Sequence, residues 1–255
     1  MDPSLYHAFY EIEDRHWWFV GRRAIVASLL AAALPPNNAG KDDRHSERRI
    51  LDVGCGTGGM LPVLSRFGRV TGIDSEPLAL EYCRKRGITD VHLQESFTAA
   101  EAFDVVTLFD VLEHVPDEAG FLEHVLKFLK PGGLFMVTVP AFQFLWSRHD
   151  DLNRHQRRYT RGRLLQVLEK AGLSIERASY FNMFLFPAAA LVRLAGGRGK
   201  ETTDGGPDDV LKQLRIGGSN GFLAGVFGSE RHLLRHVGLP FGVSLYAIGR
   251  KRIRP

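Results

Sequence analysis

A glycine-rich segment near residue 55 has the residue types and spacing of a turn that binds a ligand through its main chain. It reads Leu51-Asp52-Val53-Gly54-Cys55-Gly56-Thr57-Gly58-Gly59. Glycines here permit a tight turn and let a ligand approach the backbone closely, and a following helix would point amide groups at that ligand. The pattern alone is ambiguous, because Gly54, Gly56 and Gly59 also satisfy the dinucleotide fingerprint G-x-G-x-x-G. A turn without any ligand would have the same sequence.

Two acids and one further segment narrow the choice of ligand. Asp52 lies two residues before the first glycine, where its carboxylate can face the cationic amino acid end of a ligand. Asp74 ends the next predicted strand and can accept both ribose hydroxyls, a feature that NAD enzymes share. The segment Leu108–Val115 (LFDVLEHV) is not a dehydrogenase feature. Together these features favour S-adenosylmethionine over NAD.

At this point the sequence resembles the class I methyltransferases of the small-molecule "type 11" kind, in which four motifs recur in a fixed order. The motifs stand here at Ile50–Gly58, Gly72–Ser75, Phe103–Val115 and Leu129–Gly133, and the match covers about Arg48–Pro140. The resemblance implies S-adenosylmethionine as cofactor. It also implies a set of cofactor contacts in the glycine loop and at the strand ends, namely Asp52, Gly54, Cys55, Gly56, Gly58, Asp74, Ser75, Phe109 and Asp110.

The chain departs from that family after the third predicted strand. The family often places Gly-Asp there, with the acid contacting the adenine amino group, whereas this chain reads Gln94-Glu95-Ser96-Phe97. We therefore expect Glu95 or Ser96 to take that position. A related ubiquinone-pathway group binds a divalent metal through acids and a histidine near Asp110, Glu113 and His114. Three hard or mixed ligands so close in sequence are weak support, and a capped loop-to-helix junction explains Glu113-His114 equally well, so we predict no metal.

An aromatic and basic segment, His16-Trp17-Trp18-Phe19-Val20-Gly21-Arg22-Arg23, precedes the glycine loop. Adjacent tryptophans can be plain core anchors, because burying such rings contributes several kcal/mol. The alternative is an N-terminal lid, in which the aromatic rings exclude water and Arg22 or Arg23 reaches the cofactor carboxylate or an acidic substrate. On this interpretation Trp18 and Arg22 contact the cofactor.

A second segment, residues 140–160, follows the fifth predicted strand at the edge where doubly wound proteins bind ligands. Six arginines fall between Arg148 and Arg163, with a solvated basic helix face as the simplest explanation. Against it, Trp, His, Asp, Asn and Tyr are mixed in without helical spacing. The segment also resembles the P-A-x-x-x-L-W-S-x-H-D-x-x-x-x-H-x-R-R-Y-T element of one subset of these methyltransferases. That subset shares His16–Phe19 and an ending like Leu239–Leu245, so the resemblance spans most of the chain.

Methyl transfer is an in-line displacement that needs an aligned nucleophile, exclusion of water and, for a hydroxyl or ammonium, removal of a proton. His155 is the first candidate for the base and His149 the second, because imidazole titrates near neutrality. Asp150 would orient either ring. Substrate binding, or a plain structural hydrogen bond, would also explain His155. We further expect the acceptor to contact Trp146, Arg158 and Tyr159, with Arg158 clamping a carboxylate or phosphate.

These residues need a framework of alternating strands and helices. β-branched runs predict strands at Ile50–Val53, Val70–Ile73, Val91–Leu93, Val105–Leu108 and Leu134–Val139, with helices at Gly59–Phe67, Pro77–Arg86 and Glu118–Leu129 between them. A helix at Arg22–Leu34 precedes them, and Arg161–Ala171 (helix), Ser174–Tyr180 (strand), Phe222–His236 (helix) and Ser244–Gly249 (strand) follow. The sequence therefore predicts an α/β fold with a Rossmann-like, doubly wound, seven-stranded sheet, mostly parallel with an antiparallel last strand.

The expected parts are an N-terminal helical lid over residues 1–36, a Rossmann-like core over 48–183, a helical insertion over 184–240 and a segment 241–255. The insertion is expected to be partly mobile near 196–218, and the final segment holds the last strand and a basic tail.

The composition fits a soluble enzyme: 255 residues, 44% hydrophobic, 24% charged and a mild net charge of +4. Two cysteines offer neither a zinc pattern nor a disulfide framework, which fits a reducing cytoplasm. Arg22-Arg23 and the apolar run after them resemble a signal peptide but begin too far into the chain and lack a cleavage site. The apolar stretch Tyr180–Ala195 is too short and too interrupted to cross a membrane, although contact with a membrane surface stays open.

The leading function is S-adenosylmethionine-dependent methyl transfer to oxygen or nitrogen of a small-molecule acceptor, either anionic or sugar-linked. An RNA methyltransferase using the arginines of residues 148–163 and the basic tail is an alternative. No RNA-binding module or Asn/Asp-Pro-Pro-Tyr motif supports it, so we expect no nucleic-acid partner. An NAD-binding oxidoreductase and a non-catalytic S-adenosylmethionine-binding regulator are the remaining alternatives.

Overall fold

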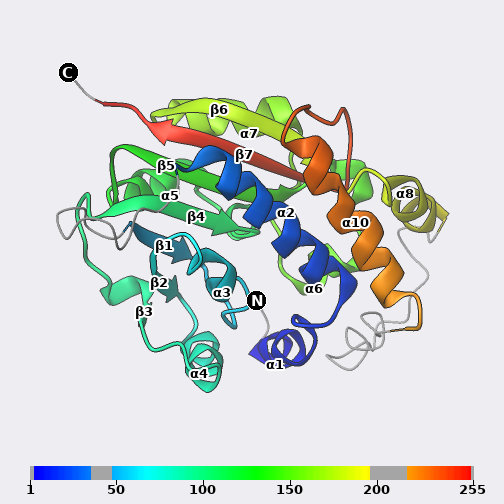
Figure 1. Ribbon diagram of the computed structural model, residues 1–255, viewed down its shortest axis with the longest axis horizontal. Helices are drawn as coiled ribbons and strands as arrows, with labels where there is room; N and C mark the ends of the chain where they lie inside the picture. Colours follow the sequence, from blue (N-terminus) through cyan, green and yellow to red (C-terminus); the bar gives the residue numbers. More distant parts are fainter. Residues whose placement is uncertain (1–2, 36–47, 196–216, 254–255) are drawn as a thin grey trace.

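The computed structural model describes residues 3–35, 48–195 and 217–253, and it is built around one seven-stranded sheet (Figure 1). The strand order is β3-β2-β1-β4-β5-β7-β6. The strands are β1 (Arg49–Val53), β2 (Arg69–Asp74), β3 (Val91–Leu93), β4 (Phe103–Phe109), β5 (Leu129–Pro140), β6 (Leu173–Phe181) and β7 (Ser244–Lys251). β1 to β5 pair in parallel, whereas β7 lies between β5 and β6 and runs antiparallel to both. The predicted fold class is confirmed, including the late-added antiparallel strand.

Strands at the centre of the sheet are covered on both faces, which explains why their sequences are mostly apolar. Ile50, Leu51 and Val53 of β1 and Val105 and Val106 of β4 are all fully buried. In register, Ile50 pairs with Val105 and Asp52 with Thr107. Asp52 therefore stands as an isolated acid within a buried strand, close to its carboxyl end.

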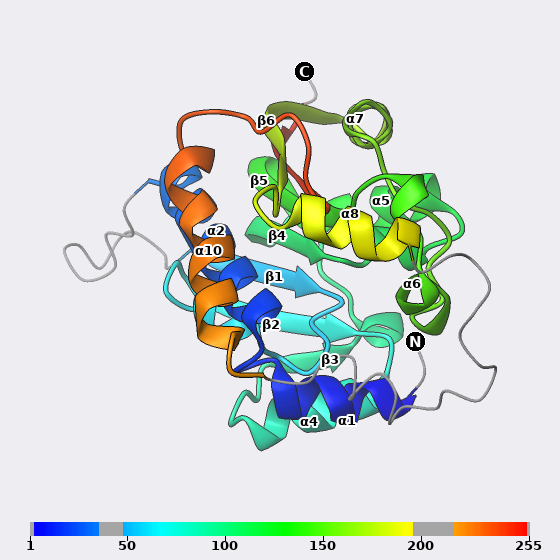
Figure 2. The same ribbon diagram turned by 90° about the vertical axis from the view of Figure 1, so that its right-hand side faces the viewer.

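Two apolar layers join the helices to the sheet. One contains α5 (Glu118–Leu126) and α7 (Arg161–Lys170), through residues such as Leu122 and Leu168. The other contains α2 (Trp17–Ala33), α3 (Leu61–Leu64), α4 (Pro77–Lys85) and α10 (Asn220–Leu234). In Figure 2, α2 in blue and α10 in orange lie side by side on one face of the sheet, while α5 and α7 lie on the other.

The α2–α10 pair approaches closely because Gly21 has no side chain. A Cβ atom at Gly21 would lie 2.4 Å from Cδ1 of the fully buried Phe227 on α10. Ser28 of α2 also links these two helices. Its hydroxyl donates a hydrogen bond to the carbonyl of Arg231 and accepts one from Arg235 Nε. The helix that follows residue 217 is thus fixed against the N-terminal helix, far away in sequence.

Several element boundaries differ from the sequence predictions. α2 begins at Trp17 rather than Arg22, because Nδ1 of His16 accepts a hydrogen bond from the amide of Trp18 and caps the helix. α1 (Pro3–Ile12) and α8 (Phe186–Ala195) lie in segments expected to be helical, but no bounds were predicted for either. α3 is a single turn rather than a helix over 59–67. The segment at 196–218 that was predicted to be mobile falls almost wholly outside the described residues. Among the described helices, none has the length and apolar character needed to cross a membrane.

Candidate functional site

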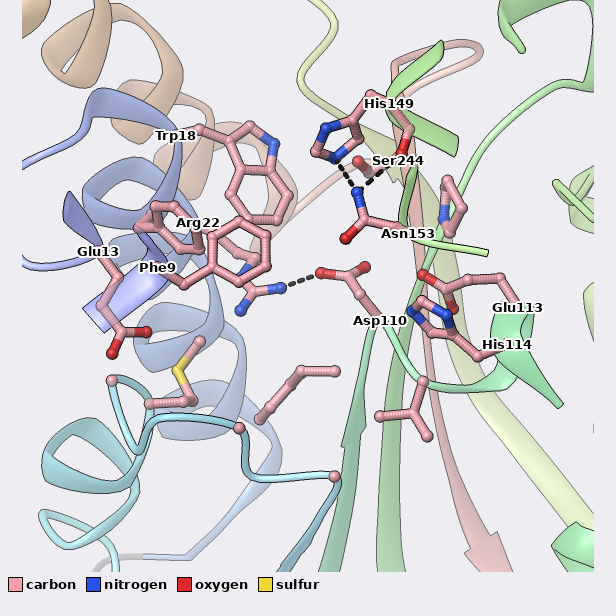
Figure 3. A pocket seen from close by; sticks show the side chains of 18 of the residues that line it. Phe9, Glu13, Trp18, Arg22, Asp110, Glu113, His114, His149, Asn153 and Ser244 are labelled. Carbon is pink, nitrogen blue, oxygen red and sulfur yellow. Dashed lines mark hydrogen bonds and ion pairs between the residues drawn. The ribbon is translucent and has the colours of Figure 1, made fainter. Parts of the chain in front are cut away.

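A cavity of about 510 Å³ opens where β1, β2, β4 and β5 end (Figure 3). Its lining includes Asp52, Asp74, Phe109 and Pro140 from those strand ends. In doubly wound sheets, ligands bind outside the carboxyl ends of the parallel strands, so this is the expected place for a site. Helices α1, α2 and α8 add further lining residues, among them Phe9, Trp18 and Ala189.

The glycine loop after β1 forms the floor of the cavity. Gly54, Gly56 and Gly58 have φ angles of 74°, 56° and 87°, which side chains rarely adopt. A Cβ at Gly54 would lie 2.4 Å from Val111 Cγ2, whereas one at Gly56 would meet nothing within 4 Å. The amide of Gly56 donates to Asp74 Oδ2 at 2.8 Å, which joins the loop to the end of β2. Gly56 therefore leaves open space at the cavity that a ligand can fill.

Two buried acids flank this loop. Thr107 donates its hydroxyl to Asp52 Oδ1 at 2.7 Å, and burial raises the pKa of Asp52 to about 7. Burial also raises the pKa of Asp74, although main-chain amides of Glu76 and Gly56 donate to its carboxylate and counteract the shift. Carboxyl groups that are costly to ionise alone are suited to a cationic or hydroxyl-rich ligand, which relieves that cost.

Most predicted cofactor contacts line the cavity. They are Asp52, Gly54, Cys55, Gly56, Asp74, Ser75, Phe109, Asp110, Trp18 and Arg22. Three others do not reach it. A Cβ at Gly58 would point at Cys83 Sγ, 3.0 Å away, and Glu95 and Ser96 are exposed on a short 3-10 turn, η1 (Gln94–Ser96). Gln94, the first residue of that turn, lines the cavity in their place.

The N-terminal helices close over the cavity through two polar contacts. Arg22 of α2 forms an ion pair with Asp110 at the end of β4, and its guanidinium lies 4.6 Å from the ring centroid of Trp18 (Figure 3). Glu13, just after α1, accepts a hydrogen bond from the Thr57 hydroxyl in the glycine loop. Burial lowers the pKa of Arg22 to about 10, so the group stays cationic near neutral pH. Residues before the first strand are therefore held directly on the ligand-binding loops.

The opposite wall is organised by one buried carboxylate, Asp150, on the short helix α6 (Arg148–Leu152). His155 Nδ1 lies 2.8 Å from Asp150 Oδ1, and Arg158 donates to both oxygens at 2.8 and 2.9 Å. Burial alone would raise the pKa of Asp150, but the hydrogen bonds from His155 and Arg158 outweigh it and hold the pKa well below its usual range. An ionised Asp150 fixes the proton of His155 on Nδ1. In the described part of the chain, Nε2 of His155 has no hydrogen-bond partner, and the residue lines the cavity.

The structure changes the interpretation of three other predicted residues in this segment. Arg158 lines the cavity, but Asp150 and the carbonyl of Ala141 occupy its guanidinium, so it has no free edge for the predicted clamp on an acceptor. Trp146 lies outside the cavity lining and donates to Asp151. Tyr159 is fully buried in the core, where its hydroxyl lies 2.6 Å from Glu118 Oε1. The structure does not bring Trp146 or Tyr159 to the cavity.

His149 reaches the cavity but differs from His155 in its surroundings. Burial lowers the pKa of His149 to about 4, so its ring is neutral near pH 7. Asn153 contacts its Nε2 at 3.2 Å and also donates to its carbonyl (Figure 3). His149 lacks the carboxylate contact that orients His155, so it is the weaker candidate for a base.

A cluster of Glu113, His114 and His155 lies beside this wall. The amide of Gln156 donates to the carbonyl of Glu113 at 2.7 Å, which brings the two segments together, and ligand atoms of the three side chains lie within 4.8 Å of one another. Burial raises the pKa of Glu113 to about 8, and neither of its oxygens has a hydrogen-bond partner among the described residues. Burial lowers the pKa of His114 to about 3. A cation could bridge ligand atoms at this spacing. The statement that the protein binds no metal therefore stays a prediction from the sequence.

Several cavity residues had no signal in the sequence. They include Phe9 of α1, Asn182 after β6, Leu185, Ala189 and Arg193 on or beside α8, and Ser244 of β7. These residues come from segments that only tertiary packing places around the cavity. A periodic pattern at Leu185, Ala189 and Arg193 is visible in hindsight, because a spacing of four places them on one helix face.

Comparisons with known proteins agree with this geometry. The profile of a family described as "Methyltransferase domain" matches residues 19–178. A protein of Mycolicibacterium smegmatis, named a probable S-adenosylmethionine-dependent methyltransferase, is 30% identical over 172 residues, which cover 65% of this chain and 62% of that protein. The ubiquinone biosynthesis O-methyltransferase of Haemophilus ducreyi is 38% identical over 107 residues, which cover 36% of this chain and 45% of the relative. The chain thus spans less than two thirds of the length of these curated relatives.

Solved structures support the fold. A methyltransferase of Archaeoglobus fulgidus that depends on S-adenosylmethionine has a TM-score of 0.52 at 17% identity, over 90% of this chain and 94% of the other. Phosphoethanolamine N-methyltransferase 2 of Haemonchus contortus, solved with S-adenosylmethionine, has a TM-score of 0.53 at 17% identity, over 90% of this chain and 52% of the other.

Proposed function

Because this chain belongs to the methyltransferase-domain family, whose cofactor here is S-adenosylmethionine, we propose that it methylates an oxygen or nitrogen of a small-molecule acceptor bound beside His155. One observation carries the proposal. A single cavity is lined both by the glycine loop with its two buried acids and by His155, whose Nδ1 is hydrogen-bonded to the buried Asp150 behind it. Cofactor and acceptor can therefore meet without a further domain.

The polar groups at one end of the cavity match the chemical groups of S-adenosylmethionine. Asp52 faces the cationic amino acid part, Asp74 accepts from the ribose hydroxyls, and Gly56 leaves room at the main chain. Asp52 and Asp74 are 2% and 5% exposed, so little water competes for them. When bound, S-adenosylmethionine supplies a methyl group on a cationic sulfur, and no acid is needed for the leaving thioether.

At the acceptor end, His155 removes the proton that a hydroxyl or ammonium acceptor must lose. Asp150 accepts the hydrogen bond from Nδ1 and stabilises the imidazolium that forms, while Nε2 takes the proton. Arg158 keeps Asp150 in place through two hydrogen bonds, which makes it a positioning residue. A hydroxyl would lose its proton to His155 as its oxygen attacks the methyl carbon, whereas an ammonium would lose its proton before its nitrogen attacks. In either case the bond between the methyl carbon and sulfur breaks, its electron pair stays on sulfur, and neutral S-adenosylhomocysteine leaves, so the positive charge passes from sulfur to His155.

In this proposal residues 3–35 serve as a lid, and residues 184–195 and 217–240 add a wall to the core formed by residues 48–183. The ion pair of Arg22 with Asp110 and the Glu13–Thr57 hydrogen bond hold the lid over the glycine loop. Phe9 and Trp18 (Figure 3), together with Phe19, then shield the reacting groups from water.

The proposal is tested by two measurements on the full chain. Calorimetry with S-adenosylhomocysteine and with NAD asks which ligand binds, and a screen of hydroxyl- and amine-bearing acceptors asks whether S-adenosylhomocysteine forms. Phenols are included because a group of relatives is named as ubiquinone biosynthesis O-methyltransferases. We expect S-adenosylhomocysteine to bind, NAD not to bind, and at least one acceptor to gain a methyl group by mass spectrometry. Binding without turnover of any acceptor would instead favour a regulator.

A further inference from the structure

Helix α8 presents one side to the cavity. Leu185, directly before it, and Ala189 and Arg193 within it all line the cavity. Residues four apart lie on the same helix face, so these three form a continuous wall. Two members of this wall are apolar, and the third carries a positive charge.

Three arginines line the cavity, and two of them already have carboxylate partners. Arg22 pairs with Asp110, and Arg158 pairs with Asp150. Arg193 instead donates through Nη1 to the carbonyl of Leu145 at 2.7 Å, and it forms no ion pair with any carboxylate in residues 3–35, 48–195 or 217–253. Arg193 therefore lines the cavity with a charge that no carboxylate of the described residues neutralises in an ion pair.

The surroundings of Arg193 reinforce a positive potential. Burial lowers the pKa of Arg193 to about 10, and the charge of Arg158 contributes in the same direction, so the group is still cationic near neutral pH. Burial is the main cause that lowers the pKa of His149 and leaves its ring uncharged, and the charges of Arg193 and Arg158 add to it. Asp150, the acid that acts on Arg193, is already bound by Arg158 and His155. A partly desolvated, unpaired guanidinium is costly, and an anionic ligand would offset that cost.

We propose that Arg193 binds an acidic group of the methyl acceptor, a carboxylate or a phosphate monoester, in the part of the cavity between α6 and α8. The planar guanidinium can form two parallel hydrogen bonds with either group. Arg193 thus takes the role that the sequence suggested for Arg158, whose donors are occupied. The identity of the ligand as a methyl acceptor rests on the proposed function, whereas the anion site itself does not.

The test measures how the protein discriminates an acid from a matched neutral compound. The probes are para-hydroxybenzoate, para-hydroxyphenyl phosphate and the neutral para-hydroxybenzyl alcohol, titrated by calorimetry with and without saturating S-adenosylhomocysteine. The variants are Arg193→Gln and Arg193→Lys, with Arg66→Gln at an exposed site as the control. We expect at least one acid to bind at least about tenfold more tightly than the alcohol to the unchanged protein, as a charge-assisted bond implies.

Arg193→Gln should abolish that preference, Arg193→Lys should keep part of it, and Arg66→Gln should keep all of it. The two acids decide between carboxylate and phosphate. The inference is overturned if neither acid binds better than the alcohol, or if Arg193→Gln weakens acid and alcohol equally. S-adenosylhomocysteine affinity should be the same in all variants. If it does not bind at all, the proposed function fails, while the acid preference measured without it still tests Arg193.

Discussion

His155 Nδ1 lies 2.8 Å from Asp150 Oδ1, and the same carboxylate is bound by Arg158 through both of its oxygens. Ser147 adds hydrogen bonds to Oδ2 from its amide and hydroxyl. One buried acid therefore orients the candidate base and neutralises a buried arginine. The predictions for this wall follow from that double role.

Replacing Asp150 should destabilise the protein as well as reduce its activity. Asp150→Asn leaves Arg158 as a buried charge without a partner, which costs on the order of 3–5 kcal/mol. The measurement is the free energy of unfolding from urea titration. Asp151→Asn is the matched control, because Asp151 is exposed and should change stability by less than about 0.5 kcal/mol. Equal effects of the two substitutions would contradict the assigned role of Asp150.

Replacing His155 should slow turnover while the cofactor still binds. Loss of a general base reduces kcat by roughly 10²–10⁴-fold, so His155→Ala should show that loss with an unchanged Kd for S-adenosylhomocysteine. The pH dependence of kcat should also lose its limb at low pH, which a purely structural role would not cause. His232→Ala, on the exposed side of α10, serves as the control and should keep full activity. A His155→Ala variant with normal kcat would remove the proposed base.

The fold and the residues proposed to bind the cofactor could be predicted from local sequence patterns. The glycine loop, Asp52 and Asp74 lie at strand ends, and a β-α-β alternation brings such ends together whatever the loops do. Gln94 was missed because its 3-10 turn directs it rather than Glu95 or Ser96 to the cavity, and spacing does not reveal a turn of that kind.

The residues on the acceptor side of the cavity could be predicted only in part. The sequence identified His155, Asp150 and Arg158 as site residues. It did not reveal that Arg158 is paired with Asp150, or that Tyr159 is buried in the core. Arg193 gave no signal, because its place in the cavity depends on how α8 packs after β6. Side-chain pairing and the placement of late helices are tertiary properties, and no periodicity in one sequence encodes them.

Filling the open space at Gly56 should weaken cofactor binding with little additional loss of stability. Gly56→Ala adds a methyl group that faces the cavity. Gly87→Ala, just after α4, adds a methyl group at a site that does not line the cavity. Both glycines have positive φ, 56° and 79°, and neither Cβ would clash, so both variants should lose about 1–2 kcal/mol of stability. Only Gly56→Ala should bind S-adenosylhomocysteine more weakly in calorimetry. Equal affinities in the two variants would place the cofactor elsewhere.

Cofactor affinity should rise with pH between 6 and 8. Burial raises the pKa of Asp52 to about 7, so below this pH the carboxyl is mostly protonated and attracts the cationic amino group poorly. As pH rises through about 7 the group ionises and the affinity for S-adenosylhomocysteine should increase, by up to about tenfold per pH unit below the pKa. Asp52→Asn should bind weakly and show a flatter profile. A flat profile in the unchanged protein would argue against contact with Asp52.

Chelation should leave activity unchanged. The cluster of Glu113, His114 and His155 has a spacing that a cation could bridge, but a cation on His155 would occupy the lone pair that the base needs. We therefore expect equal kcat before and after treatment with EDTA, and no stoichiometric metal by elemental analysis. If EDTA abolished the activity and a divalent ion restored it, the result would contradict the role of His155 as a base and would indicate a metal site at this cluster.

The most direct measurement is a crystal structure of the full chain with S-adenosylhomocysteine. The account predicts that the ligand lies along the glycine loop with its amino group at Asp52 and its ribose at Asp74. Its sulfur should face Nε2 of His155 across a gap that can hold the transferred methyl group and one acceptor atom, with that atom about 3 Å from both the methyl carbon and Nε2 in the reacting geometry. A sulfur that faces away from His155, or a ligand bound outside this cavity, would contradict the account.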